Sequence, residues 1–281
     1  MITFSANQPV IMGILNLTPD SFSDGGCYTD AEIAVTHARA MVEEGAAIID
    51  VGGESTRPGS KRVSAEEQLS RILDIIRALR KAIPKEIIIS IDTTLVPVAE
   101  TVIRAGANML NDISAGRDDP RMFALAAETG VPLVLMHMQG TPATMQDNPT
   151  YDDVVAEVQA FLLQRAAAAE KAGVKKQQIV IDPGIGFGKT REHNLQLLAA
   201  LPAFTASGYP VLLGTSRKRF MGTICREQSA DELIGATCAT TVIGTQAGVS
   251  IFRVHDVRPN RQALEVARAV SSMQGAMRGR S

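Results

Sequence analysis

Short apolar runs recur along the chain, at intervals that leave room for a helix between each run and the next. They are rich in Ile, Val and Leu, and many of them end at a polar residue. A parallel sheet that is covered on both faces needs strands of this nearly continuous apolar kind. The runs predict strands at 10–15, 48–51, 87–91, 109–110, 133–136, 179–181, 211–213 and 251–254.

The segments between these runs carry apolar residues at helical spacing and stop at residues that commonly end helices. Gly45, Gly106, Gly130 and Gly173 each follow one of these segments directly, and Pro84 follows another. Glycine and proline at these positions favour a helix end. The pattern predicts helices at 31–44, 65–83, 96–105, 120–129, 152–172, 194–205, 231–247 and 261–273.

Strands alternating with helices over 281 residues predict an α/β fold, a (β/α)8 TIM barrel, which usually needs ~250 residues. A doubly wound open sheet has the same alternation and is the structural alternative. No linker-like or low-complexity segment divides the chain. We therefore expect a single domain over 1–281, with 274–281 as a frayed tail.

Composition excludes several classes of partner. The net charge of -2 and the pI of about 6.1 give no positive surface for nucleic acid or an anionic membrane. No apolar run approaches the ~20 residues of a membrane span, and the N-terminus lacks the features of a signal peptide. Cys27, Cys225 and Cys238 are odd in number and lack metal-type spacing. These observations predict a cytoplasmic protein.

The segment 179–189 joins a buried strand to a glycine-rich loop. Asp182 ends the strand, and Gly184, Gly186 and Gly188 follow Pro183. A phosphate-binding P-loop would need glycine in place of Pro183, and a dinucleotide-binding motif would need glycine at 189, where the chain has lysine. Both motifs fail by one residue. A carboxylate on a strand end beside a permissive loop instead favours a small-molecule site.

Polar residues end several of the predicted strands. They are Asn16, Asp92, Asn111, His137 and Asp182. The carboxyl ends of barrel strands meet at one face, and a ring of buried polar groups is costly unless it forms a pocket. Asp92, Asn111 and Asp182 offer hydrogen-bond acceptors, which suit an aminopyrimidine edge with several N–H donors.

A second group at the same face offers positive charge. Arg57, Lys218, Arg253 and His255 suit a phosphate or diphosphate, and the amide oxygen of Asn16 suits Mg²⁺ beside that diphosphate. Two further polar residues keep alternatives open. Asp50 is as consistent with a structural anchor as with a site residue. His137 is as consistent with a structural hydrogen bond as with the pocket, so we leave it outside the predicted site.

Eight ordered motifs resemble the dihydropteroate synthase family over 12–257. The first two are Gly-Ile-Leu-Asn-Leu-Thr-Pro-Asp-Ser-Phe-Ser-Asp at 13–24 and Ile-Asp-Val-Gly-Gly-Glu-Ser-Thr-Arg-Pro-Gly at 49–59. Ser-Ile-Asp-Thr at 90–93, Asn-Asp-Ile at 111–113 and Met-His-Met-Gln-Gly at 136–140 follow. Asp-Pro-Gly-Ile-Gly-Phe-Gly-Lys at 182–189, Ser-Arg-Lys at 216–218 and Arg-Val-His-Asp-Val at 253–257 complete the set.

The resemblance implies a dimeric barrel and a transferase of folate biosynthesis. The implied reaction joins 6-hydroxymethyl-7,8-dihydropterin diphosphate to p-aminobenzoate and releases diphosphate. It further implies Mg²⁺ as cofactor and makes the protein a sulfonamide target. No protein nucleophile is required. Asp92, Lys218 and Arg57 would be the catalytic residues, with Asp92 stabilising a cationic methylene.

The resemblance also distributes the substrate-binding residues. Asp92, Asn111 and Asp182 would hold the pterin, helped by Lys218 and by Met136 or Met138. Asn16 would bind Mg²⁺, while Thr56, Arg57, Arg253 and His255 would hold the diphosphate. Phe22, Pro58, Phe187 and Ser216 would border p-aminobenzoate, and Gly214 would complete the substrate-binding set.

Two other functions use related residues. A pterin-dependent methyltransferase of the same superfamily would keep Asp92, Asn111 and Asp182 but would not need Arg57 or the Ser-Arg-Lys motif. A non-catalytic pterin-binding paralogue would be expected to lose charged site residues, and here they are present. Motif completeness therefore favours the synthase.

Overall fold

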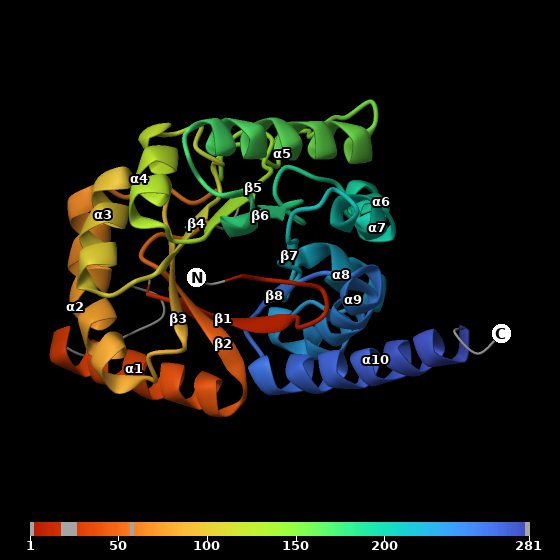
Figure 1. Cartoon of the computed structure of the whole chain (residues 1–281), viewed down its shortest axis with the longest axis horizontal. Coiled ribbons are helices and arrows are strands. Elements are labelled where there is room, and N and C mark those ends of the chain that lie inside the picture. The colour runs from red at the N-terminus through yellow and green to blue at the C-terminus, as the bar shows by residue number, and fades with distance from the viewer. Residues whose placement is uncertain (1–2, 18–26, 57–58, 279–281) are drawn as a thin grey trace.

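Eight parallel strands form the centre of the molecule (Figure 1). The computed structural model describes residues 3–17, 27–56 and 59–278. The predicted strands are confirmed, and most bounds differ by one or two residues. They are β1 (Val10–Asn16), β2 (Ala46–Gly52), β3 (Ile88–Asp92), β4 (Met109–Asp112), β5 (Leu133–Met136), β6 (Ile179–Asp182), β7 (Leu212–Leu213) and β8 (Ile251–Val254).

The sheet closes on itself. Its strand order is β6-β5-β4-β3-β2-β1-β8-β7, and every pairing is parallel. A parallel bridge between Ile181 and Val211 then joins the two ends of this order, β6 and β7. Closure removes the free edges that an open sheet would have. The (β/α)8 barrel is therefore confirmed, and the doubly wound alternative is wrong.

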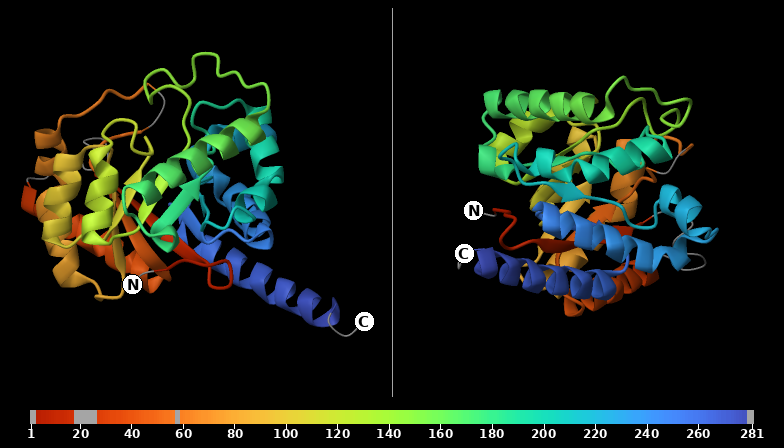
Figure 2. Two further views of the ribbon diagram at one scale, coloured as in Figure 1. Left: turned by 45° about the horizontal axis from the view of Figure 1, so that its top comes forward. Right: turned by 90° about the vertical axis from the view of Figure 1, so that its right-hand side faces the viewer.

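Helices cover the outside of the barrel (Figure 2). They are α1 (Cys27–Glu43), α2 (Ala65–Ala82), α3 (Val96–Ala105), α4 (Arg121–Thr129), α5 (Val154–Lys171), α6 (Arg191–Ala199), α7 (Leu201–Thr205), α8 (Arg219–Cys225), α9 (Ile234–Ala247) and α10 (Val257–Arg278). Short 3-10 turns occupy Lys176–Gln178 and Ala230–Leu233. Among the described residues, no helix is both long enough and apolar enough to cross a lipid bilayer.

Four helical segments differ from the sequence prediction. The helix expected at 194–205 is split into α6 and α7, because Pro202 lies in the first turn of α7 and cannot donate a backbone hydrogen bond to the turn before it. The segment at 231–247 opens with a 3-10 turn before α9. The short helix α8, with Gly222 in its centre, was not predicted. Helix α10 continues to Arg278, so the helix extends into the segment expected to fray.

One apolar residue from each strand fills the interior of the barrel. These eight residues form a separate buried cluster and are Met12, Ile48, Ile88, Met109, Val134, Val180, Leu212 and Ile251. A second, larger cluster lies between the strands and the helices and includes Ile49, Val51 and Ile91. Since side chains alternate across a strand, these two clusters occupy the inner and outer faces of the same strands.

We predict that Ile48→Ala destabilises the protein by about 2–5 kcal/mol, the range for truncating a well-packed core residue. Ile48 is fully buried in the interior cluster, and its seven partners come from seven different strands, so the cavity cannot collapse easily. Ile33→Ala on α1 is the matched control, because that side chain is 48% exposed. Urea unfolding measures both variants, and equal losses would contradict a tightly packed interior.

Candidate active site

On four of the strands, the residue two positions beyond the interior apolar residue belongs to a polar layer. Moving two residues along a strand keeps the side chain on the same face. This step leads from Ile48 to Asp50, from Met109 to Asn111, from Val180 to Asp182 and from Ile251 to Arg253. Asp50 and Asn111 are buried, as is Asp182. The carboxyl end of the barrel therefore has a charged floor directly above the apolar interior.

Arg253 of β8 joins two carboxylates across this floor. Its Nε donates to Asp50 Oδ2 at 2.6 Å, and its Nη2 donates to Asp92 Oδ2 at 3.0 Å. Asn111 Nδ2 donates to the same Asp50 oxygen at 3.1 Å. Asp50 is fully buried, and its Oδ1 has no hydrogen-bond partner among the described residues. The network ties β8 to β2, β3 and β4.

Burial and charge act in opposite directions on this network. Burial raises the pKa of Asp92 by more than the neighbouring Arg253 lowers it. For Arg253, burial lowers the pKa, but Asp50 and Asp92 outweigh it and the net shift is upward. Arg253 therefore stays charged, while the pKa of Asp92 is raised to about 7, so additional hydrogen-bond donors would favour its ionised form.

Asp182 lies at the end of β6, opposite a lysine. Its Oδ1 accepts a hydrogen bond of 2.7 Å from Gly184 N. Burial raises the pKa of Asp182 to about 6, against the lowering effects of Gly184 N–H, Lys218 and Lys189. Gly214 has no side chain to cover this carboxylate; a Cβ there would lie 4.0 Å from both Asp182 Oδ2 and Arg253 Cβ. A ligand edge can therefore approach Asp182 directly.

Lys218 lies in the loop after β7, close enough to Asp182 to lower its pKa, and its side chain lies over an aromatic ring. Its Nζ lies 4.0 Å from the centroid of Phe187 in the glycine-rich loop, a cation–π arrangement. Burial lowers the pKa of Lys218 to about 8, and Arg253 adds to this effect, while Asp182 and Asp92 oppose it. Met136 and Met138 are buried beside Phe187 and form an apolar wall.

His255 is neutral in this environment, which corrects the expectation that it offers positive charge. Burial lowers its pKa to about 3, and Arg253 and Arg217 act in the same direction. Ser216 Oγ accepts from His255 N at 3.1 Å and lies 2.9 Å from His255 Nδ1. Arg217 lies in the loop after β7 and donates two hydrogen bonds to Asp256, which follows β8, at 3.0 and 2.8 Å. These bonds join the two segments.

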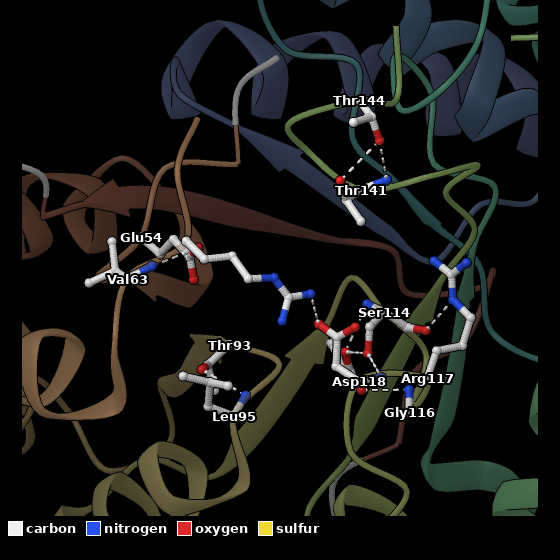
Figure 3. A network of polar contacts seen from close by, with 12 residues as sticks. Glu54, Val63, Thr93, Leu95, Ser114, Gly116, Arg117, Asp118, Thr141 and Thr144 are labelled. Carbon is white, nitrogen blue, oxygen red and sulfur yellow. Dashed lines mark hydrogen bonds and ion pairs between the residues drawn. The ribbon is translucent and has the colours of Figure 1, made fainter. Parts of the chain in front are cut away.

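The rim loops after β2, β3, β4 and β5 approach one another above the floor (Figure 3). Glu54 Oε1 accepts from Val63 N at 3.2 Å and closes the base of the β2–α2 loop. The far side of this loop reaches its neighbours, with Gly59 N donating to Pro142 O at 3.0 Å and Arg62 pairing with Asp118 at 2.6 Å. Arg62 is mostly exposed, so this ion pair contributes little stability.

Asn16 and Thr56 lie at the carboxyl end of β1 and in the loop after β2. Asn16 ends β1 and is in register with Gly52, which is in register with Asp92. A Cβ on Gly52 would lie 3.8 Å from Asn16 Oδ1 and 3.6 Å from Asp92 Cβ. The absent side chain leaves space between the two. Thr56 is half-buried on the β2–α2 loop. Phe22, Arg57 and Pro58 lie outside the described residues.

The side-chain oxygen of Asn16 would suit a Mg²⁺ ion whose other ligands come mainly from a substrate. Mg²⁺ prefers oxygen ligands and often keeps water while using one or two protein groups and substrate phosphates. Asn16 supplies one such oxygen. In the described part of the chain, no three His, Cys, Asp or Glu side chains are placed to hold a metal by themselves. A site for Mg²⁺ would therefore depend on a phosphate-bearing ligand.

Three polar residues around the pocket were missed by sequence reasoning or left unassigned. Asp50 is part of the floor, and the alternation that starts at Ile48 is the signal that could have assigned it. His137 follows β5 and packs edge-on against Phe161 of α5, at 5.0 Å between ring centroids. Lys189 is buried behind the glycine-rich loop, and its contact with His137 has no sequence signal.

Comparison with known proteins identifies the family. The model of the family described as pterin binding enzyme matches residues 12–255. The dihydropteroate synthase of Escherichia coli K12 is 45% identical over 95% of this chain and 93% of its own length. The Xanthomonas albilineans dihydropteroate synthase structure with 4-aminobenzoic acid superposes with a TM-score of 0.88, at 44% identity over 95% of this chain and 94% of that one.

A second structure of that Xanthomonas enzyme, in complex with 7,8-dihydropteroate, superposes with a TM-score of 0.84 at 41% identity over 95% of both chains. The matches span nearly the whole barrel, including the strand ends that carry the floor residues. The resemblance drawn from the eight motifs is confirmed. The chain belongs to the pterin-binding enzyme family and, within it, to the dihydropteroate synthases.

Proposed function

We propose that the chain condenses 6-hydroxymethyl-7,8-dihydropterin diphosphate with p-aminobenzoate, giving 7,8-dihydropteroate and diphosphate. The observation that carries this proposal is the polar floor, where three acceptors face a pocket that also presents two fixed cations. Asp92, Asn111 and Asp182 are the acceptors, and Lys218 and Arg253 are the cations. The Xanthomonas relatives bind an aminobenzoate and a dihydropteroate, and both ligands are consistent with such a pocket.

The acceptors suit the edge of the pterin that carries several N–H donors. Asp182 is a buried carboxylate with one oxygen engaged by Gly184 N, and burial has raised its pKa to about 6. A ligand that donates hydrogen bonds to it would offset the cost of that burial. Met136 and Met138 would cover the faces of the ring system. Binding would thus combine apolar contact with a directional polar edge.

The reaction needs a leaving group stabilised on one side and a cation stabilised on the other. The methylene carbon–oxygen bond breaks, and its electron pair leaves with the diphosphate. The positive charge is delocalised into the electron-rich dihydropterin, and the Asp92 carboxylate lies on the floor where it would stabilise that charge. The aniline nitrogen then attacks the methylene carbon and loses a proton. Fixed positions for both substrates would supply much of the rate.

Groups for the diphosphate come from several elements. Arg253 is a permanent cation held in place by two carboxylates, and neutral His255 offers a hydrogen bond rather than a charge. Arg57 and Thr56 remain predicted members of this subsite. Mg²⁺, held by Asn16 and the phosphates, would supply charge neutralisation when bound. Phe187 and Ser216, with Phe22 and Pro58, remain the predicted border of the aminobenzoate subsite.

We also propose that the whole chain is one domain that forms a homodimer through α10. Val266, Val270, Met273 and Met277 lie at helical spacing along α10 and are all exposed, Val266 by 65% and Met277 by 73%. This end of α10 runs past the rest of the barrel (Figure 1). An apolar stripe of this length on one helix favours burial against a partner, and a second copy of the chain provides a matching stripe.

We propose a cytoplasmic location because the described cysteines form no disulfide. Cys225 and Cys238 are both free thiols in the described part of the chain. Free thiols are typical of proteins from reducing compartments.

Asp182→Asn tests the pterin assignment. The amide keeps the shape but replaces part of the acceptor edge with a donor, so we predict a loss of about 2–4 kcal/mol in pterin binding by calorimetry. In the wild type, pterin affinity should fall as the pH drops from about 7 through about 6, because Asp92 and then Asp182 become protonated. Unchanged affinity in Asp182→Asn would remove Asp182 from the pterin subsite.

The same variant separates binding from folding. Burial raises the folded-state pKa of Asp182 from 3.8 to about 6, so its contribution to stability is present below pH 3.8 and is lost as the pH rises through 6. The neutral amide avoids this loss. We therefore expect the melting temperature of Asp182→Asn at pH 8 to be no lower than that of the wild type, although pterin binding is weaker.

Lys218→Ala tests the reaction. Lys218 lies in a loop and not in either apolar cluster, so we predict a cooperative melt like that of the wild type and at least about a hundredfold loss of turnover. Diphosphate release is measured with and without p-aminobenzoate. Wild-type release that depends on both substrates supports the synthase over a methyltransferase or a non-catalytic paralogue. A variant with normal turnover would exclude Lys218 from the chemistry.

The dimer is tested by placing charge on the α10 stripe. Val266→Glu with Val270→Glu should give a monomer by light scattering coupled to size exclusion, because burying two carboxylates in an apolar interface is strongly unfavourable. Ile33→Glu on α1 is the matched control, since Ile33 is also exposed but lies on another helix. A wild-type monomer, or a double variant that remains dimeric, would contradict this interface.

A further inference from the structure

Lys189 is a buried lysine behind the glycine-rich loop that follows β6. Its side chain is nearly inaccessible to solvent, at 3% exposure for the residue. Its Nζ lies 2.9 Å from Phe187 O, 3.0 Å from His137 Nδ1 and 3.3 Å from His137 O. An ammonium group has three N–H donors, and here three acceptors surround it. Simple packing would require only an apolar side chain at this position.

The histidine ring is set up to accept a hydrogen bond. Burial lowers the pKa of His137 to about 2, and the charges of Lys189 and Arg117 act in the same direction, so the ring is neutral. Because Lys189 donates to Nδ1, the ring proton is assigned to Nε2. The backbone of His137 also donates to Asp182 O at 3.0 Å. His137 thus links the lysine to the strand residue that carries the Asp182 carboxylate.

The glycine-rich loop that Lys189 contacts packs closely on the residues that follow β5. A side chain at two of its glycine positions would clash with that backbone. A Cβ on Gly184 would lie 1.9 Å from His137 O, and one on Gly188 would lie 2.6 Å from Gln139 O. Both glycines also have positive φ, 66° and 61°, which favours glycine. The loop is therefore pressed against residues 137–139, and the lysine fastens it there.

The other side of the same loop forms part of the pocket. The ring of Phe187 lies under Lys218 Nζ at 4.0 Å. A Cβ on Gly186 would lie 2.9 Å from Lys218 Cδ, so the loop backbone also supports the stem of this lysine. Gly184 N donates to Asp182 Oδ1 at 2.7 Å. Fixing the carbonyl of Phe187 therefore fixes the groups that touch Lys218 and Asp182.

We propose that Lys189 is a positioning residue for the condensation: it holds Phe187 and Lys218 in place over the pterin subsite. A second, electrostatic part of the inference follows from its buried charge behind the loop whose Gly184 N–H contacts the Asp182 carboxylate. This inference rests on the proposed function, because it assigns Asp182, Phe187 and Lys218 to the substrates. Lys189 itself lies behind the loop and is not assigned a contact with substrate.

The charges around the two groups give the direction of the electrostatic effect. Asp182 faces Lys218, Lys189 and Arg253, all of which lower its pKa against the effect of burial. Lys189 faces Asp182, Lys218 and Arg117, with His137 neutral. Burial and the two cations lower the pKa of Lys189 to about 7, and Asp182 opposes them. Near pH 6 Lys189 is therefore charged, and removing it should raise the pKa of Asp182.

Lys189→Met tests both parts of the inference, since methionine keeps most of the length of the side chain without its charge or its donors. We expect kcat at pH 8 to fall at least about tenfold, because the groups over the pterin lose their position. Pterin affinity at pH 8 should change by less than about threefold, since Asp182 is ionised there in both proteins. The acid midpoint of pterin binding that is due to Asp182, near 6 in the wild type, should move upward by about half a pH unit or more.

Two further variants complete the design. Lys85→Met is the matched control on an exposed lysine before β3, and it should behave as the wild type in every measurement. Lys189→Gln keeps N–H donors without the charge. It should retain kcat within about threefold of the wild type while showing the upward shift of the midpoint.

A folded Lys189→Met with wild-type kcat and an unchanged midpoint would overturn the inference. If that variant does not melt cooperatively, Lys189→Gln decides by the same two measurements: a raised midpoint supports the inference, and an unchanged midpoint overturns the electrostatic role. The two proposals can fail separately. Wild-type protein that releases no diphosphate with both substrates would refute the proposed function, whereas the pH titration of pterin binding still measures the coupling of Lys189 to Asp182.

Discussion

The salt bridges that Arg253 makes to Asp50 and Asp92 are the interaction on which the pocket depends. The partners are separated by 203 and 161 residues in sequence, and they meet because β8 pairs with β1, which places it two strands from β2 and three from β3 in the curved sheet. An unpaired charge at this depth would be strongly unfavourable, whereas a paired one is tolerated. The pairing therefore couples the docking of β8 beside β1 to the construction of the site. Apolar packing alone, from the cluster below, would close a barrel without giving it a polar floor.

The floor is built at some cost to folding. Burial raises the pKa of Asp92 and Asp182 and lowers that of Lys218, so each of these groups would be easier to keep charged in water. Asp50 Oδ1 and Ser90 Oγ are buried without partners among the described residues. A substrate rich in N–H donors and phosphate oxygens would compensate part of this cost. Stability and binding therefore compete for the same side chains.

Much of this arrangement could be predicted from sequence, because it follows from local periodicity. The strands were placed closely, and the polar residues at their ends did converge. Closure was predicted with the barrel, but periodicity alone also allowed a doubly wound open sheet, and the long-range bridge between Ile181 and Val211 decides between the two. Asp50 stayed ambiguous because a lone carboxylate in an apolar run does not reveal its partner, Arg253. Lys189 was missed because its acceptors belong to His137 and to a neighbouring backbone carbonyl, and neither pairing leaves a periodic pattern.

The start of the helix after the glycine-rich loop bears on where phosphate can be bound. In dinucleotide-binding folds the pyrophosphate lies at such a helix N-terminus. Here the first turn of α6 is closed by its own cap, with His193 N donating to Thr190 Oγ1 and Thr190 N to His193 Nδ1. The backbone N–H groups of Thr190 and His193 are thus used internally. This leaves side chains across the floor, such as Arg253, as the groups proposed to hold a diphosphate. The loop is then free to shape the ring subsite, which is the part of the pocket where Phe187 and Lys218 meet.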